Sequence, residues 1–348
     1  MIDILFNNET TSIPATELHF TALQEGNTIF QHFLASPNLT QLQSLSFKKG
    51  DLNNESLELL QSHAMRATLK SLSLSDNFFV GEDQKVTDFL AQLETPLLQT
   101  LNLNNCYLSV ASIKAVIANK HFKGLKSLDL SNNRNIDSAL LQLSKSATLK
   151  SLEELYISNT GLQPATLFEL VSSVNFSNIK KFDIGFNFAL GDDLAAVMDD
   201  RPFIRYVEYL GVSRCDLTSE GLKYLCKNRF LGNLKDLDIS KNPKTALQGI
   251  LDEWEDFEML ANLNQVIAHE CGASSQELAQ LNDELSTNFV NLSPGVIAFQ
   301  ELIQHLTQDI PGLNEEELAE KMKRLEEEEA KRLEAEAAEA EAANSGAA

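Results

Sequence analysis

A motif of nine residues recurs along this chain and limits its possible folds more than any other feature. The clearest copy reads LKSLDLSNN, residues 125 to 133, with leucine at the first, fourth and sixth positions and asparagine at the ninth. The fourth positions of ten successive copies are 27 to 29 residues apart. A fixed period of this size indicates a solenoid, in which each unit buries its apolar side against its neighbours. The fourth positions are Leu18, Leu45, Leu72, Leu101, Leu128, Leu155, Phe182, Leu210, Leu237 and Val266.

The order of apolar positions, L-x-x-L-x-L-x-x-(N/C), is that of leucine-rich repeats. Within each copy the apolar residues alternate as in a strand. The intervening segments instead have helical spacing, as Val86, Phe89, Leu90 and Leu93 illustrate. We therefore predict an α/β leucine-rich repeat solenoid, shaped as a horseshoe with a concave parallel β-sheet and convex helices.

The ninth position alternates between asparagine and a smaller side chain. A buried asparagine can satisfy both donors and acceptors of the turn that leaves each strand, whereas a thiol or hydroxyl does so more weakly. The residues are Asn77, Cys106, Asn133, Thr160, Asn187, Cys215, Asn242 and Cys271. This alternation resembles the ribonuclease-inhibitor subclass of leucine-rich repeats over about residues 15 to 290. The resemblance implies the fold, since that subclass includes inhibitors, GTPase-activating proteins, actin-capping proteins and pathogen effectors.

Four segments follow from the pattern. Residues 1–14 are expected to form an N-terminal cap over the first strand, whose edge would otherwise stay unpaired. Residues 15–274 hold about ten repeats of 27 to 29 residues. Residues 275–312 have the spacing of amphipathic helices and are predicted to form a helical C-terminal cap. Residues 313–348 are rich in Glu and Ala, which predicts a charged, partly disordered helical tail.

Charge and composition exclude several classes of partner. A net charge of -22 argues against nucleic acid and against anionic membrane surfaces. No Lys or Arg precedes Lys48 and no apolar run reaches 18 residues, so we expect neither a signal peptide nor membrane insertion. The four cysteines have structural places as thiols: three occupy ninth positions and Cys226 lies on a predicted helix. We expect a monomer that folds in the cytoplasm.

The sequence predicts no enzyme, cofactor or metal site. Its six histidines are scattered over separate units. The phosphate-binding, nucleophile-elbow and dinucleotide motifs are all missing, as are paired cysteines of the C-x-x-C type. Binding is the more natural use of such a fold, because strand residues beside the buried fourth position face the concave side.

The predicted partner-binding residues come from the fifth and eighth positions of the units between 150 and 245, with their neighbours. These units combine aromatic rings, arginine and charges, which often dominate interface energies. The side chains are expected to share the concave face. They are Tyr156, Lys181, Asp183, Phe186, Tyr209, Arg214 and Lys241. The interpretation left open is that Phe186 or Tyr209 packs between units.

Two functional hypotheses remain. The first is a non-catalytic protein-binding effector or adaptor, because the Glu-rich block at 326–329 near the C-terminus resembles export signals of type IV secretion substrates of intracellular bacterial pathogens. It implies signal-peptide-independent delivery into a host cytosol and a host protein partner. The second is a regulator of a small GTPase that resembles Ran GTPase-activating proteins, with Arg134 in the position of their edge-loop arginine. The tail of this chain mixes Lys and Arg with Glu, which departs from the pattern of the Ran GTPase-activating proteins.

Overall fold

The structure is a computed structural model of the 348-residue chain. It describes residues 16–21, 26–35, 39, 41–79, 83–199, 201–253, 262–285 and 289–291. The chain divides into two compact units, residues 1–292 and 293–348. The predicted N-terminal cap and acidic tail, and residues 292–312 of the predicted C-terminal cap, lie outside the described residues.

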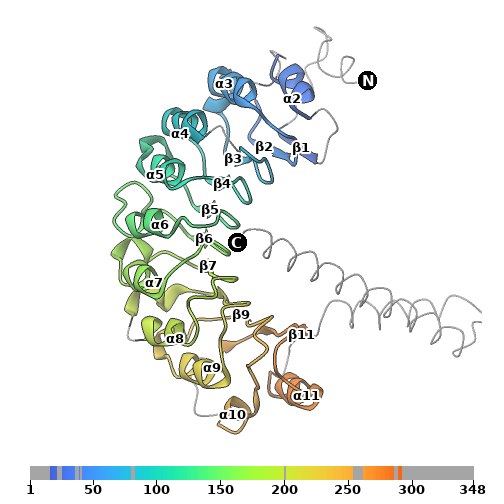
Figure 1. The fold of residues 1–348 in the computed structure, drawn as a ribbon, viewed down its shortest axis with the longest axis vertical. Coiled ribbons are helices and arrows are strands. Elements are labelled where there is room, and N and C mark those ends of the chain that lie inside the picture. The colour runs from blue at the N-terminus through green and yellow to red at the C-terminus, as the bar shows by residue number, and fades with distance from the viewer. Residues whose placement is uncertain are drawn as a thin grey trace, which may run out of the picture. The chain divides into compact units, whose positions relative to one another are not determined.

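A single parallel sheet runs through the described part of the first unit, with its eleven strands in chain order. Figure 1 shows the strands on the inner side of the curve and the helices on its outer side. This arrangement confirms the predicted leucine-rich repeat solenoid. The strands are β1 (Glu17–Thr21), β2 (Ser44–Lys48), β3 (Ser71–Ser73), β4 (Thr100–Asn102), β5 (Ser127–Asp129), β6 (Glu154–Tyr156), β7 (Lys181–Asp183), β8 (Tyr209–Gly211), β9 (Asp236–Asp238), β10 (Gln265–Ile267) and β11 (Phe289–Asn291).

The strand register confirms the alignment of the repeats. Leu72 pairs with Leu101, Leu101 with Leu128, and Leu128 with Leu155. The same row continues in both directions, so all ten fourth-position residues stand side by side. From Leu45 to Val266 each of them is buried. The apolar spine is therefore continuous, and neighbouring units stabilise one another through it.

Helices cover the outer side of the sheet, as their apolar spacing predicts. In α4, for example, Val86, Phe89 and Leu90 are buried against the core. The α-helices are α2 (Gly26–Leu34), α3 (Asn54–Ser62), α4 (Asp83–Gln92), α5 (Val110–Ala118), α6 (Asp137–Leu143), α7 (Pro164–Val171), α8 (Asp193–Met198), α9 (Ser219–Cys226), α10 (Gln248–Leu251) and α11 (Ser275–Glu284). The 3-10 helices are η2 (Ala64–Ala67), η3 (Lys120–Phe122), η4 (Val174–Phe176), η5 (Pro202–Tyr206) and η6 (Arg229–Leu231).

The ninth-position asparagines join their units to the units before them. Asn187 accepts hydrogen bonds from the backbone of Thr160 and Leu162, both at 3.0 Å. Its amide nitrogen donates to the carbonyl oxygen of Ile157 at 3.0 Å. The thiols of Cys106 and Cys215 each make one weaker bond of this kind, and Cys215 donates to the carbonyl oxygen of Ile184 at 3.3 Å. The thiol of Cys271 instead donates to Ala268 within its own unit. The alternation is thus a ladder of side-chain bonds between units.

The C-terminal side of the sheet differs in one respect from the prediction. Helix α11 forms as expected, with Leu281 and Leu285 buried and Ser274 capping its first turn. Beyond α11, this segment also contains β11, which pairs with β10 through Val266 and Val290. Residues 289–291 are too few to give a recognisable alternating pattern, so the sequence analysis did not identify this strand.

Candidate binding surface

The open face of the sheet carries a row of fifth-position side chains. In the register of the strands, Tyr156 pairs with Asp183, Asp183 with Gly211, and Gly211 with Asp238. Adjacent strands lie about 4.8 Å apart, so these side chains are direct neighbours. Tyr209 begins β8 and lies on the same face, two residues before Gly211. We call Tyr156, Asp183 and Tyr209 the open-face cluster.

Asp183 is held in place at the centre of this cluster. Its Oδ1 accepts hydrogen bonds from the hydroxyl of Ser158 at 2.6 Å and from the backbone nitrogen of Gly185 at 2.9 Å. Burial raises the pKa of the Asp183 carboxyl, and the nearby carboxylates Asp238 and Asp129 act in the same direction. The two hydrogen bonds oppose this shift. The carboxylate is therefore fixed in orientation and only partly accessible.

Gly211 allows Asp183 and Tyr209 to come together. A methyl group at position 211 would lie 2.7 Å from Asp183 Oδ1 and 3.0 Å from the hydroxyl oxygen of Tyr209. Both distances are shorter than carbon–oxygen contact allows, so the two polar groups occupy space that only a glycine leaves open. The repeat pattern alone did not predict this role of Gly211.

Both tyrosines are half-buried and remain hydrogen-bond donors. Burial raises the pKa of Tyr156 to about 12, with the carboxylate of Glu154 adding to the effect. Burial also raises the pKa of Tyr209, and the Asp183 carboxylate acts in the same direction. Each residue therefore presents part of its ring and a neutral hydroxyl to the open face, a combination common in protein interfaces.

Lys181, which is predicted to contact the partner, forms an ion pair within the sheet. It begins β7, and its ammonium group lies 2.9 Å from Glu154 Oε1 on the neighbouring strand. The charge is thus matched within the sheet, although half of the side chain remains exposed. An exposed pair of this kind contributes little to stability.

The eighth-position residues do not lie on strands, which corrects part of the prediction. Strands β3 to β10 end at the fifth position, so the eighth lies in the turn that follows, at the carboxyl edge of the sheet. Each of these nine residues has a positive φ. In the first half several are Asn or Asp, which tolerate this conformation, but the second half has bulkier side chains. They are Lys49, Asp76, Asn105, Asn132, Asn159, Phe186, Arg214, Lys241 and Glu270.

At the carboxyl edge, Arg214 contacts two aromatic rings. Its guanidinium carbon lies 5.6 Å from the ring centre of Phe186 and 5.2 Å from that of Phe188. The ammonium group of Lys241 lies 5.9 Å from the ring centre of Phe186. We call Phe186, Phe188, Arg214 and Lys241 the carboxyl-edge cluster. Phe186 is half-buried, and both cations near its ring come from the two following units.

Sequence reasoning missed Phe188, whose side chain is 56% exposed. It stands at the tenth position of its unit, one residue after Asn187, whereas the prediction considered the fifth and eighth positions. The same column contains Phe78 and Tyr107, whose exposed rings lie 5.1 Å apart in an edge-to-face pair. Reading the tenth position would have found all three exposed rings at the carboxyl edge.

Arg134 also lies at this edge, in a groove of about 650 Å³ that includes Tyr107 and several asparagines. The asparagines form a chain of side-chain hydrogen bonds: Asn159 donates to Asn132 at 2.9 Å, and Asn132 donates to Asn104 at 3.2 Å. Arg134 is exposed and makes no ion pair within the part of the chain that the structure describes.

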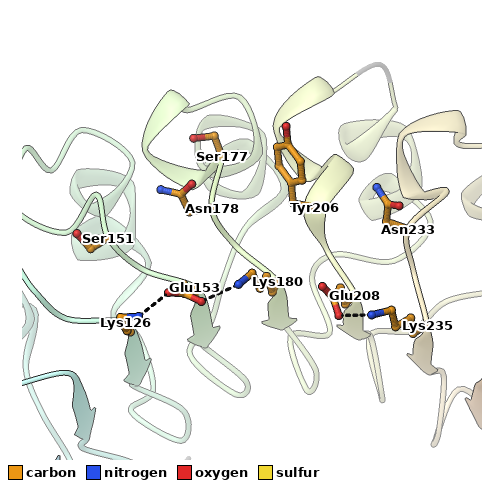
Figure 2. Close-up of a pocket in the computed structure, with 10 residues that line it drawn as sticks. All are labelled: Lys126, Ser151, Glu153, Ser177, Asn178, Lys180, Tyr206, Glu208, Asn233 and Lys235. Carbon is orange, nitrogen blue, oxygen red and sulfur yellow. Dashed lines mark hydrogen bonds and ion pairs between the residues drawn. The ribbon is translucent and has the colours of Figure 1, made fainter. Parts of the chain in front are cut away.

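The opposite, amino edge of the sheet carries a second groove of about 980 Å³ (Figure 2). Its floor is a row of alternating charges at the second position: Lys126, Glu153, Lys180, Glu208 and Lys235. Glu153 lies 3.0 Å from Lys126 and 2.8 Å from Lys180, and Glu208 lies 2.6 Å from Lys235. Hydrogen bonds from Lys180 and Lys126 lower the pKa of Glu153. The charges of this amino-edge groove are therefore matched internally.

The seven predicted residues thus divide between two neighbouring surfaces. Tyr156, Lys181, Asp183 and Tyr209 lie on the open face, whereas the other three lie at the carboxyl edge beyond the strands. Among the described residues, no group of three or more His, Cys, Asp or Glu side chains could hold a metal ion. No helix in the described ranges is both long and apolar enough to cross a bilayer. What the two surfaces offer is rings, cations and fixed polar groups, which suit recognition of another molecule.

Comparison with known proteins agrees with this fold. No protein-family model matches the chain. A chain in the crystal structure of the Rad7 and Elc1 complex of yeast is similar over 80% of this chain and 72% of its own length, with a TM-score of 0.59 and 17% identity. An internalin from Listeria monocytogenes aligns over 84% of this chain and 93% of its own length, with a TM-score of 0.43 and 15% identity. At these identities the likeness concerns architecture alone, and the chain is a leucine-rich repeat solenoid in fold.

Proposed function

We propose that this chain is a non-catalytic module that binds a protein partner through the open face and carboxyl edge of β6 to β9. The observation that carries the proposal is the continuity of the open-face and carboxyl-edge clusters: partly exposed rings, a fixed carboxylate and Arg214 lie on adjacent units. Rings and arginine contribute disproportionately to interface energies, and exposed rings in a group mark interaction sites. The similar yeast chain was also crystallised in a complex.

Affinity capture with two matched variants tests this function. Tyr156→Ala/Tyr209→Ala/Arg214→Ala removes side chains from both clusters. Phe168→Ala/Tyr224→Ala removes two exposed rings from the outer helices, where they are 40% and 45% exposed. We expect the wild type and the outer variant to retain the same partner and the triple variant to lose it. Equal recovery by all three proteins would show that the partner binds elsewhere.

We further propose that the protein acts as an effector or adaptor, delivered into a host cytosol without a signal peptide. The support is the Glu-rich sequence at 326–329, which lies outside the described residues. Translocation of a reporter fused to the N-terminus of the full chain tests this idea. Replacing the four glutamates at 326–329 with glutamine should abolish delivery, and undiminished delivery would exclude this block as the signal.

Activation of a small GTPase is the second candidate function. It is favoured by one observation: Arg134 is exposed in the asparagine-lined groove at the carboxyl edge and forms no ion pair with any residue that the structure describes. Arginine can stabilise the charge that develops on a transferring phosphoryl group. GTP hydrolysis by a panel of small GTPases provides the test: acceleration that Arg134→Ala abolishes would favour the regulator, and no acceleration would leave the binding module.

A further inference from the structure

Two cations at the carboxyl edge of the sheet differ in their contacts from the lysines at the amino edge. At the amino edge, Lys126, Lys180 and Lys235 each lie within 3.0 Å of a glutamate oxygen. At the carboxyl edge, Arg214 and Lys241 contact rings and form no ion pair within the described ranges. With 50 acidic residues in the chain, carboxylates are not scarce. Within the part of the chain that the structure describes, Arg214 and Lys241 therefore have no ion-pair partner and can bind a charge from outside.

Arg214 contacts two rings and donates no side-chain hydrogen bond to any residue that the structure describes. A guanidinium group that stacks on aromatic rings uses its face, while its five N–H groups lie along its edge. Those N–H groups match the two oxygens of a carboxylate, and such a bidentate pair is among the strongest polar contacts in proteins. Lys241, above the same Phe186 ring, adds a second positive charge beside the first.

A groove of about 520 Å³ lies beside these cations, lined by Phe188, Arg214, Asp216, Lys241, Pro243 and Glu270. Phe188 and Pro243 are both exposed and supply apolar surface. Of the two acidic residues, Asp216 is paired with Lys244 at 2.8 Å, and Glu270 pairs with neither groove cation. The groove thus joins an apolar wall to two positive charges that have no ion-pair partner among the described residues.

The backbone at Arg214 and Lys241 also adopts a conformation that these residue types disfavour. Arg214 and Lys241 have φ of 50° and 58°, where glycine or asparagine would be less strained. A left-handed conformation costs other residues roughly 1 to 2 kcal/mol. The equivalent positions in earlier units, Asn105, Asn132 and Asn159, have the expected asparagine. The turn itself is common to all nine units, so what differs at the groove is the larger, charged side chain that the turn carries.

We propose that this groove binds an acidic peptide segment of the partner in which a carboxylate side chain stands beside an aromatic or aliphatic one. The carboxylate binds Arg214 and Lys241, and the apolar side chain lies between Phe188 and Pro243. This inference rests on the proposed protein-binding function and names the chemistry of the partner at one part of the surface.

Fluorescence anisotropy of labelled synthetic peptides with the full chain tests the proposal. The probe is a six-residue acetylated peptide that alternates Glu and Phe, and its matched controls replace Glu with Gln or Phe with Ala. We expect the Glu–Phe peptide to bind roughly tenfold more tightly than either control, because both the charge and the ring are used. Affinity should fall as NaCl rises from about 50 to about 500 mM, because salt screens exposed charges.

Variants at the left-handed positions separate loss of binding from loss of folding. Arg214→Gly/Lys241→Gly removes both cations and relieves the backbone, so the midpoint of thermal unfolding should stay the same or rise. Binding of the Glu–Phe peptide should nevertheless weaken by roughly tenfold or more. Arg134→Gly, at the neighbouring groove, should leave it unchanged. Equal affinity for the Gln–Phe peptide, or undiminished binding by the double variant, would overturn the proposal.

Failure of this inference can be told apart from failure of the proposed function. Tyr156→Ala/Tyr209→Ala changes only the open face, so it should weaken capture of the protein partner while the peptide still binds. If the peptide does not bind but the open-face variant loses the partner, the function stands and the groove chemistry is wrong.

Discussion

The side-chain oxygen of Asn133 lies 2.9 Å from the backbone nitrogen of Leu108, in the unit before it. The same oxygen also accepts a hydrogen bond from the backbone nitrogen of Cys106 at 3.2 Å. Asn133 is fully buried. Its amide nitrogen donates to the carbonyl oxygens of Leu103, Leu130 and Ser131. One side chain therefore satisfies backbone groups in two consecutive units, which the repeat needs because these turns are sealed from water.

Asn133→Ala should lower the free energy of unfolding by roughly 3 kcal/mol, because it leaves several buried backbone groups unpaired. The change is measured by urea denaturation. Asn132→Gly is the matched control, since Asn132 is exposed and glycine accepts its φ of 61°. The control should alter stability by less than about 0.5 kcal/mol. Similar losses in both variants would show that the ladder is not what joins the units.

The cysteines should differ in reactivity. Burial raises the pKa of Cys106, Cys215 and Cys226 to about 12, so their thiols stay protonated and covered. Cys271 is partly exposed. We expect alkylation of the native protein near neutral pH to modify Cys271 first, because exposure and thiolate content control the rate. Mass spectrometry after a timed reaction measures this order, and early labelling of Cys226 would contradict the packing of α9.

Asp183 should make stability depend on pH in a predictable direction. Burial raises its pKa above the ordinary value of 3.8. A carboxyl of this kind favours the folded state while protonated, and that contribution is lost as pH rises through its raised pKa. The stability of the wild type relative to Asp183→Asn should therefore fall as the pH rises above the ordinary carboxyl value of 3.8. Denaturation at several pH values measures it.

Ser158→Ala provides the control for this titration. The Ser158 hydroxyl lowers the pKa of Asp183 by donating to it, so its removal should make the decline with pH steeper. A relative stability that instead rises with pH would mean that the hydrogen bonds outweigh burial at Asp183.

Gly211→Ala should disturb the open-face cluster while leaving the repeat intact. The added methyl group would lie 2.7 Å from Asp183 Oδ1, so the carboxylate has to move away from Ser158 and Gly185. We expect a loss of about 1 kcal/mol in stability, at the low end for overpacking, together with weaker partner binding. Gly124→Ala is the control, since its nearest neighbour would be 3.8 Å away. Titration with the partner measures the change in binding, and denaturation measures the change in stability.

Much of the fold could be predicted because the repeat couples local pattern to packing. Leu72, Leu101, Leu128 and Leu155 have the same spacing and so the same place in the core, which fixed both the strands and their register. The helices of the outer side followed from residues such as Val86 and Phe89. Strand β11 lies where this periodicity ends, so no repeating pattern predicted a strand there.

The candidate site was less predictable, because it depends on conformations within a unit. The prediction extended the alternation of strand residues to the eighth position, and so assigned Phe186, Arg214 and Lys241 to the concave strands. In the structure the chain instead turns at the eighth position, where φ is positive. Alternation therefore stops before it reaches them. The runs of Asn at the same column, as in Asn132 and Asn159, were the available signal for a left-handed turn. The contact between Gly211 and Asp183 depends on atomic distances that no pattern encodes.

Site-specific photocrosslinking tests the central claim, that the partner is bound at the carboxyl edge of β6 to β9. A photoreactive phenylalanine derivative can replace Phe188, which is 56% exposed in the carboxyl-edge cluster, or Phe168, which is 40% exposed on the outer helix α7. We predict that the partner is crosslinked from position 188 and not from position 168. Crosslinking from position 168 alone would contradict the account.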